Sequence, residues 1–345
     1  MPVNKSAHLV PNILEKEKLE AKPTRDGFGL GVVEAGKKDP NVVVICADLS
    51  ESTRAQMFQK EFPNRYVEVG VAEQNMATVA AGMALAGKVP FIASYAAFSP
   101  GRNNEQIRTA ISLNNTNVKI MGAHAGVSVG PDGATHQALE DMGLMRLQPN
   151  MKVFAPCDLW EAKKIVEIIA QIYGPCYMRF AREKTPVLTT AETPFAIGKA
   201  QLFWTAKGGS ASGGESAKDK VDVVIFACGP LVHESLLAAA ELEKAGLGVE
   251  VYDNPSVKPL DEKTILAAAR RARAVVTAEE HQVTGGLGGA IAEFLGENHP
   301  VPVIKVGVKD RFGESGEPDE LMVKFGLVAK DIAAAAKRAI TLKSK

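Results

Sequence analysis

Side chains that can exchange protons, bind anions or pack on flat rings follow a series of short apolar runs in this sequence. Imidazoles can donate to hydroxyls and move protons at carbonyl oxygens, and arginine offers a fork of fixed cationic donors to a phosphate dianion. Taken singly, a glutamate that opens a helix is usually a cap and a strand-end aspartate a turn former. Such residues indicate a functional site only if the fold brings them together. Those that follow the apolar runs here are Asp48, Ser50, Ser52, Glu73, Tyr95, Phe98, His124, Asp132, His136 and Arg182.

The apolar runs alternate with helical patterns. Strands are expected over 42–47, 67–69, 90–93, 118–121, 153–155 and 176–179, and helices over 26–37, 73–86, 103–113 and 158–172. Short β-branched runs between helical patterns are typical of buried parallel strands. The sequence therefore predicts a doubly wound α/β sheet. Ligands bind beyond the carboxyl ends of such strands, so the polar residues above are expected at one sheet edge.

The chain divides into an arm and two α/β domains. Residues 1–23 form a polar arm, and the first domain is assigned to 24–190. The α/β pattern restarts at 221–227 and continues with strands at 249–252, 274–278 and 301–306 and a helix over 329–342, which assigns 191–345 to a second domain. The Gly- and Ser-rich segment 207–220 has the composition of a flexible loop. The run 285–289 is no complete dinucleotide fingerprint and is expected to allow close packing at a helix start.

Composition excludes several classes of function. The 345 residues carry 40 Lys+Arg and 40 Asp+Glu, so a net charge of zero gives no electrostatic case for nucleic acid or membrane binding. No apolar stretch is long enough to span a bilayer, and the N-terminus has no signal core. The four cysteines form no CxxC pair and are expected as buried free thiols in a reducing compartment, so the cytoplasm is the expected location. His8, His233 and His299 match no motif and are expected at the surface.

Several motifs, in order along the chain, resemble those of the transketolase family. The segment 70–76, Gly-Val-Ala-Glu-Gln-Asn-Met, resembles the signature of the pyrimidine-binding domain of thiamine diphosphate enzymes. The segment 132–137, Asp-Gly-Ala-Thr-His-Gln, resembles the substrate loop of transketolases. The segments 47–49 and 179–182 resemble the family's strand-end Asp and strand-end Arg. The segments 279–281 and 310–316 resemble the transketolase C-terminal domain. The resemblance covers about residues 24 to 340 and implies a pyrimidine-binding domain followed by a transketolase C-terminal domain.

The resemblance also implies roles for individual residues. Glu73 would hydrogen-bond N1′ of the aminopyrimidine and favour the imino tautomer that removes a proton from the cofactor, and His124 and His136 would share the catalytic work. Asp48, Val71, Tyr95 and Phe98 would line the cofactor pocket. Position 95 is Tyr where Phe is common, and the segment that follows is one residue longer, so either ring is expected to stack on the pyrimidine. The substrate would contact Arg25, Ser52, His124, Asp132, His136 and Arg182, with the arginines and Ser52 at its phosphate.

One part of a full-length transketolase is missing from this sequence. The family's diphosphate-binding domain carries a Gly-Asp-Gly segment and a later Asn of the metal site, and neither is present. The resemblance therefore implies a split enzyme, in which an N-terminal partner subunit binds most of the Mg²⁺ (or Ca²⁺) and the diphosphate. Two copies of each chain would form an α2β2 heterotetramer. A stand-alone homodimer without turnover is the alternative.

The implied function is thiamine diphosphate-dependent transfer of a two-carbon ketol unit from a ketose phosphate to an aldose phosphate, as in the pentose phosphate pathway. Two other enzymes remain alternatives. A 1-deoxyxylulose-5-phosphate synthase has a similar substrate loop but usually an Asp where His124 stands. The β chain of a 2-oxo acid dehydrogenase decarboxylase has about this size, but the loop with Asp132, Thr135 and His136 disfavours it. A non-catalytic regulatory homologue is a further alternative, which the presence of Glu73 disfavours.

Overall fold

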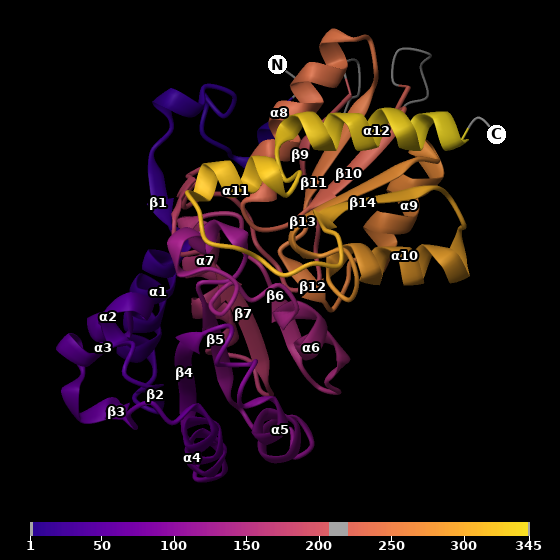
Figure 1. The fold of residues 1–345 in the computed structure, drawn as a ribbon. Coiled ribbons are helices and arrows are strands. Elements are labelled where there is room, and N and C mark those ends of the chain that lie inside the picture. The colour runs from indigo at the N-terminus through magenta and orange to yellow at the C-terminus, as the bar shows by residue number, and fades with distance from the viewer. Residues whose placement is uncertain (1–2, 207–219, 344–345) are drawn as a thin grey trace.

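The computed structural model describes residues 3–206 and 220–343, so the predicted loop 207–220 lies outside the described residues except for Lys220. The first domain is built on a seven-stranded sheet with the order β12-β6-β7-β5-β4-β2-β3 (Figure 1). Six of these strands are mutually parallel, and β12 pairs antiparallel to β6. The strands are β2 (Val42–Cys46), β3 (Tyr66–Glu68), β4 (Val89–Tyr95), β5 (Lys119–Ala123), β6 (Lys152–Phe154), β7 (Cys176–Phe180) and β12 (Ser256–Lys258). The six predicted parallel strands are confirmed.

Helices cover both faces of this sheet, as the doubly wound prediction requires. Successive side chains of a strand point to opposite faces, so Val44 packs with one set of helices and Ile45 with the other. One face carries α1 (Thr24–Lys38), α3 (Ala55–Glu61) and α7 (Leu159–Ile169). The other carries α4 (Glu73–Leu85), the π-helix η4 (Ile107–Ser112) and α6 (Asp141–Leu147). Short helices α2 (Ser50–Thr53) and α5 (Asn104–Gln106) lie in the connections.

The second domain is a five-stranded sheet with the order β14-β13-β10-β11-β9, in which only β9 is antiparallel. Its strands are β9 (Gln201–Trp204), β10 (Val223–Ala227), β11 (Val249–Asp253), β13 (Val275–Gln282) and β14 (Val303–Val308). Helices α8 (Leu231–Lys244) and α12 (Ala329–Lys343) pack on one face, and α9 (Glu262–Ala272) and α10 (Leu287–Asn298) on the other. This sheet is also doubly wound.

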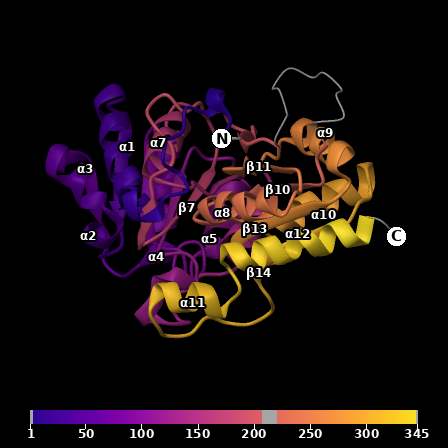
Figure 2. The ribbon, with the colours of Figure 1, turned by 90° about the horizontal axis from the view of Figure 1, so that it is seen from above.

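The two domains share structure that the sequence did not reveal. Strand β12 follows β11 of the second domain but completes the edge of the first sheet, where Ser256 pairs with Phe154. One apolar core continues from Ile92 and Met145 of the first domain to Phe226 and Ile265 of the second. Helix α11 (Pro318–Lys324) of the second domain packs against η5 (Val127–Asp132) of the first (Figure 2). Strand β12 has a single apolar residue, Val257, between Ser256 and Lys258, so no apolar run marked it as a strand.

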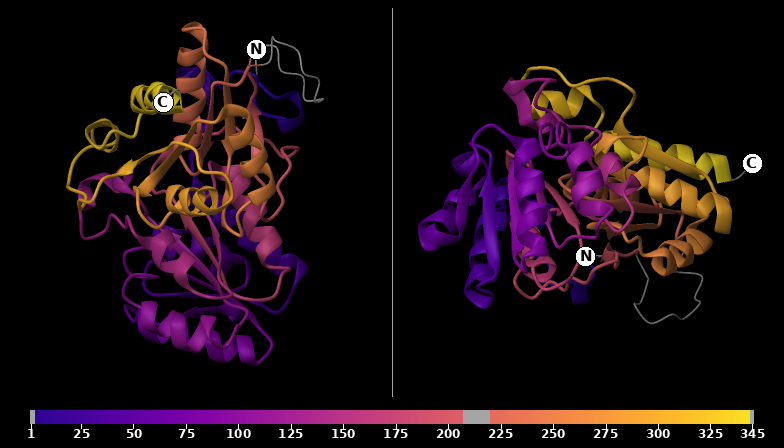
Figure 3. Two further views of the ribbon diagram at one scale, coloured as in Figure 1. Left: turned by 90° about the vertical axis from the view of Figure 1, so that its right-hand side faces the viewer. Right: turned by 90° about the horizontal axis from the view of Figure 1, so that it is seen from below.

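The N-terminal arm is anchored to both domains. Beyond the short 3₁₀ helices η1 (Lys5–Ala7) and η2 (Lys16–Lys18), strand β1 (Ala21–Pro23) pairs with β8 (Lys184–Pro186). The start of the arm lies beside the second domain (Figure 3), where Val3 bridges to Trp204. His233 is buried beneath it, and its Nε2 lies 3.0 Å from the carbonyl oxygen of Ile13. The surface assignment of His233 was therefore wrong, because the arm covers the helix that carries it.

Other predictions concern burial and the membrane. All four cysteines are free and buried, as expected. Within the described residues, the structure contains no helix with the length and hydrophobicity needed to traverse a membrane.

At the Gly-rich run 285–289, the N–H groups of Leu287 and Gly288 donate to the carboxylate of Glu279 at 2.8 and 2.7 Å. A protein carboxylate thus takes the position of an anion at the start of α10, which supports the rejection of a phosphate loop.

Candidate active site

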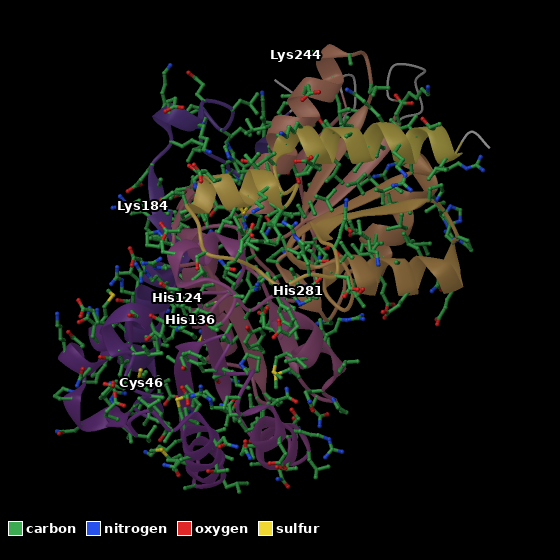
Figure 4. All side chains as sticks on the ribbon, in the orientation of Figure 1. Cys46, His124, His136, Lys184, Lys244 and His281 are labelled. Atoms are coloured by element: carbon green, nitrogen blue, oxygen red, sulfur yellow. The ribbon has the colours of Figure 1, made fainter. Side chains whose placement is uncertain are left out.

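Five segments bring the predicted site residues to one edge of the first sheet. Tyr95 ends β4, His124 directly follows β5, and Arg182 lies two residues beyond β7. These strands are parallel neighbours, so their carboxyl ends meet at the same edge. His136 comes from the loop after η5, and Glu73 opens α4. Figure 4 shows His124 and His136 next to each other at this edge. The prediction that the edge gathers these side chains agrees with their positions.

Four rings form the centre of the site. The imidazole of His124 stacks on Tyr95 with a centroid separation of 4.0 Å. His136 meets the edges of Tyr95 and Phe98 at 5.9 and 5.3 Å, and Tyr95 stacks on Phe98 at 5.8 Å. The Oγ1 of Thr135 lies 2.9 Å from Nδ1 of His136, which fixes the orientation of that ring. Such offset and edge-on contacts give the cluster a defined geometry.

Burial and nearby positive charge act on His124. Burial, followed by the charges of Arg25 and Arg182, lowers the pKa of His124 to about 3. Its side chain is 1% exposed, and its Nδ1 has no hydrogen-bond partner among the described residues. Arg25 donates from Nη1 to the carbonyl oxygen of Ser52 at 3.0 Å, and Arg182 donates from Nη1 to that of Val129 at 2.8 Å. The site thus combines a neutral imidazole with two guanidinium groups, a combination suited to a phosphorylated polyol.

Glu73 is joined to the ring cluster by an arginine that the sequence analysis did not identify as a site residue. The Glu73 carboxylate is 2% exposed and accepts a hydrogen bond from Nη1 of Arg102 at 2.9 Å. The guanidinium carbon of Arg102 also lies 4.7 Å from the centroid of Phe98. A continuous series of contacts therefore runs from Glu73 through Arg102 and Phe98 to the histidines. No local pattern marks Arg102, because its partner Glu73 belongs to another segment, 29 residues earlier in the chain.

The second domain holds the loop that carries His136. Gln137 donates from Nε2 to the carbonyl oxygens of Val127 at 3.1 Å and Glu314 at 2.9 Å. Gly133 has φ 72°, and a Cβ there would lie 2.5 Å from Oγ of Ser315. The backbone N–H of Ser128 donates to Oε1 of Glu280 at 2.6 Å. The segments 279–281 and 310–316 of the second domain thus support the loop 127–137.

Three predicted residues lie at the surface of the protein. Asp48 is exposed, with φ 58°, and its backbone N–H donates to Oε1 of Glu68 at 2.8 Å. Val71 is 72% exposed, and Asp132 is also exposed. Glu68, which the sequence analysis did not consider, also accepts from the N–H of Gly70 at 2.9 Å and so holds the loop before Glu73.

His281 is buried and its ring nitrogens lie against backbone groups. It is fully buried, its Nδ1 lies 2.8 Å from the carbonyl oxygen of Gln282, and the N–H of Gly143 donates to its Nε2 at 3.3 Å. The described residues also contain one group of three potential metal ligands within 4.8 Å of one another, Cys157, Glu161 and Asp253. None of the three belongs to the predicted site.

Comparisons with known proteins agree with this architecture. The sequence matches the family models "Transketolase, pyrimidine binding domain" over residues 20–187 and "Transketolase, C-terminal domain" over residues 213–332. It is 41% identical to a putative transketolase C-terminal section of Methanocaldococcus jannaschii, over 90% of this chain and 94% of that protein. It is also 41% identical to a 6-deoxy-6-sulfo-D-fructose transketolase subunit of a Clostridium species, over 92% and 95% of the two chains. A solved structure described as a split gene transketolase, inactive beta4 tetramer, superposes with a TM-score of 0.84 at 44% identity, covering 93% of this chain and 99% of that one.

Proposed function

Because this chain belongs to the transketolase family, we propose that it is the C-terminal subunit of a split transketolase that moves a two-carbon ketol unit from a ketose phosphate to an aldose phosphate. The observation that carries the proposal is the series of contacts from Glu73 through Phe98 and His136 to His124, with Arg25 and Arg182 beyond. Such a series offers, in order, a carboxylate for a cofactor ring, aromatic surface, imidazoles for hydroxyls and guanidiniums for a phosphate.

The residues of this chain fit the pyrimidine half of thiamine diphosphate. Glu73 is a buried carboxylate at the first position of α4, and a buried charge needs a donor partner. It would share a proton with N1′ of the aminopyrimidine, with Tyr95 or Phe98 against the ring and Asp48 and Val71 at the rim of the pocket. When bound, the cofactor supplies an electron sink for carbon–carbon bond cleavage and formation.

The remaining side chains bind and orient the sugar. Arg25, Ser52 and Arg182 would hold its phosphate, because guanidinium groups match that dianion in charge and geometry. Asp132 would accept from the donor's hydroxyl groups. His124, kept neutral by its low pKa, would donate a hydrogen bond without carrying charge, and His136 would hold or move a proton at the carbonyl oxygen.

We further propose that activity needs an N-terminal partner subunit. Two observations support this: the relative from Methanocaldococcus jannaschii is named a C-terminal section, and the split gene transketolase of similar fold is described as an inactive tetramer of its beta chain. Mg²⁺ (or Ca²⁺) and the diphosphate would be held mainly by the partner. Two copies of each chain would form an α2β2 assembly.

The test is reconstitution. This chain, an N-terminal transketolase section, thiamine diphosphate and Mg²⁺ are mixed with xylulose 5-phosphate and ribose 5-phosphate, and sedoheptulose 7-phosphate is measured. Product should form only when both chains are present. Parallel reactions replace the ketose with pyruvate. Use of pyruvate without use of the ketose would assign the chain to a 1-deoxyxylulose-5-phosphate synthase instead, and activity of this chain alone would refute the need for a partner.

A further inference from the structure

Arg102 makes two contacts that a cofactor ring would also need. Its Nη1 donates to Oε2 of Glu73 at 2.9 Å, and its guanidinium lies over Phe98 at 4.7 Å from the ring centroid. A planar cation that donates to a carboxylate while lying on an aromatic face resembles an aminopyrimidine protonated at N1′ in both respects. Glu73 is almost completely buried, so it needs a donor whenever the cofactor is absent.

We propose that Arg102 is a positioning residue that occupies the place of the aminopyrimidine on Glu73 and Phe98 and must leave before the cofactor binds. This inference rests on the proposed function, since it takes Glu73 as the cofactor's carboxylate. In the cofactor-free subunit, Arg102 neutralises Glu73 and holds its side chain toward the ring cluster. Binding then exchanges the guanidinium for a ring that carries a proton at N1′, taken up from solvent. The measured affinity for the cofactor is reduced by the free energy of the contacts that Arg102 loses.

The surrounding contacts allow the side chain of Arg102 to move while its backbone stays fixed. The next residue, Asn103, is fully buried and donates from Nδ2 to the carbonyl oxygen of Glu73 at 3.0 Å and to Oγ of Ser99 at 3.1 Å. These bonds attach the segment to the start of α4. The side chain of Arg102, in contrast, is 49% exposed. It can therefore turn into solvent without unfolding any element.

The experiment measures thiamine diphosphate binding by calorimetry in the reconstituted two-chain enzyme with Mg²⁺. Arg102→Met removes the charge but keeps an unbranched apolar side chain, and Arg102→Lys keeps the charge but loses the planar stack. Partly exposed ion pairs and cation–π contacts are weak, so the dissociation constant should fall by about threefold to twentyfold in Arg102→Met. Arg102→Lys should give an intermediate value. Arg108→Met, which removes an exposed charge from the following helix, should leave the constant unchanged.

A second measurement separates this role from a merely structural one. The isolated chain is titrated with 4-amino-2-methylpyrimidine at a fixed, buffered pH, and the ring takes up from solvent the proton that it shares with Glu73. Salt screens a partly exposed ion pair, so the difference in probe affinity between the wild type and Arg102→Met should narrow as NaCl is added. This readout does not require the partner subunit.

The possible results distinguish a failure of the role proposed for Arg102 from a failure of the proposed function. If the wild-type enzyme binds thiamine diphosphate and turns over, but Arg102→Met and Arg102→Lys bind it equally or more weakly, the role of Arg102 is wrong and the proposed function stands. If folded wild-type enzyme and all variants fail to bind the cofactor, the proposed function is wrong and this inference falls with it. Tighter binding by Arg102→Met, with a difference from the wild type that narrows as NaCl is added, supports the inference.

Discussion

His124 stacks on Tyr95, with ring centroids 4.0 Å apart and an angle of 26° between the ring planes. The contact buries the imidazole at the carboxyl end of β5, where Arg25 and Arg182 add positive charge. Burial and these charges together disfavour the imidazolium form. His124 is therefore a neutral hydrogen-bonding group at any physiological pH, and the positive charge of the site comes from the arginines.

The first prediction concerns stability in acid. The pKa of His124 falls from 6.5 to about 3 on folding and that of His233 to about 4, both mainly through burial. Between these values and 6.5 the unfolded chain binds more protons than the folded one, so the free energy of unfolding should decrease as the pH falls from 6.5 to 4. Each histidine should contribute a slope of about 1.4 kcal/mol per pH unit at most. Urea unfolding across this range measures it.

The variants His124→Gln and His233→Gln should each reduce this slope, and the double variant should reduce it most. His8→Gln is the control, because His8 is exposed. An unchanged slope in the double variant would contradict the assignment of the acid sensitivity to these two residues.

The second prediction concerns Glu73. Glu73→Gln keeps the shape of the side chain but removes the carboxylate that would share a proton with the aminopyrimidine. Positioned proton transfer contributes about 10²–10⁴-fold to rates, so kcat of the reconstituted enzyme should fall by at least about 100-fold. Circular dichroism should show an unchanged fold. Glu105→Gln, an exposed residue in the next helical segment, should keep full activity; comparable activity in both variants would refute the role of Glu73.

The third prediction concerns the phosphate of the sugar. Arg182→Met should raise KM for a phosphorylated donor by about tenfold, which corresponds to the loss of about 1.4 kcal/mol of binding. It should have little effect on KM for a donor without phosphate. Lys184→Met, which changes an exposed charge two residues away, serves as the control. Equal effects of Arg182→Met on the two donors would place the phosphate elsewhere.

The fourth prediction concerns a buried carboxyl pair between the domains. Both carboxyl oxygens of Asp253 lack a hydrogen-bond donor among the described residues, and Glu161 lies against it. Burial, and the neighbouring carboxyl group, raise the pKa of Asp253 well above its usual value. The folded chain therefore keeps a proton that the unfolded chain releases, so this pair's contribution to stability is lost as the pH rises above about 4.

Asp253→Asn replaces the proton with a permanent amide donor. The variant's melting temperature, compared with that of the wild type, should therefore improve between pH 5 and pH 8. Asp261→Asn is the matched control, because asparagine also caps a helix well and Asp261 caps α9. Identical pH dependence in Asp253→Asn and the wild type would show that the pair holds no such proton.

Much of the fold was accessible from local patterns. The run from Val42 to Cys46 and the run from Cys176 to Phe180 are buried on both faces, and such strands keep a recognisable apolar composition in isolation. Polar residues placed after parallel strands must meet at one edge, so Tyr95, His124 and Arg182 could be grouped before their contacts were known. His233 was misplaced because its burial depends on the arm around Ile13, more than 200 residues away.

The sequence alone determined the α/β class, the parallel strands of the first sheet and the residues that define the family, because these depend on short-range periodicity and on residue type. Only the tertiary structure decided that Arg102 pairs with Glu73, that Asp253 meets Glu161 and that β12 joins the first sheet. Each of these contacts joins segments whose separation along the chain exceeds any local period. Their energies depend on burial and on the partner that is present, and neither quantity is a property of a single segment.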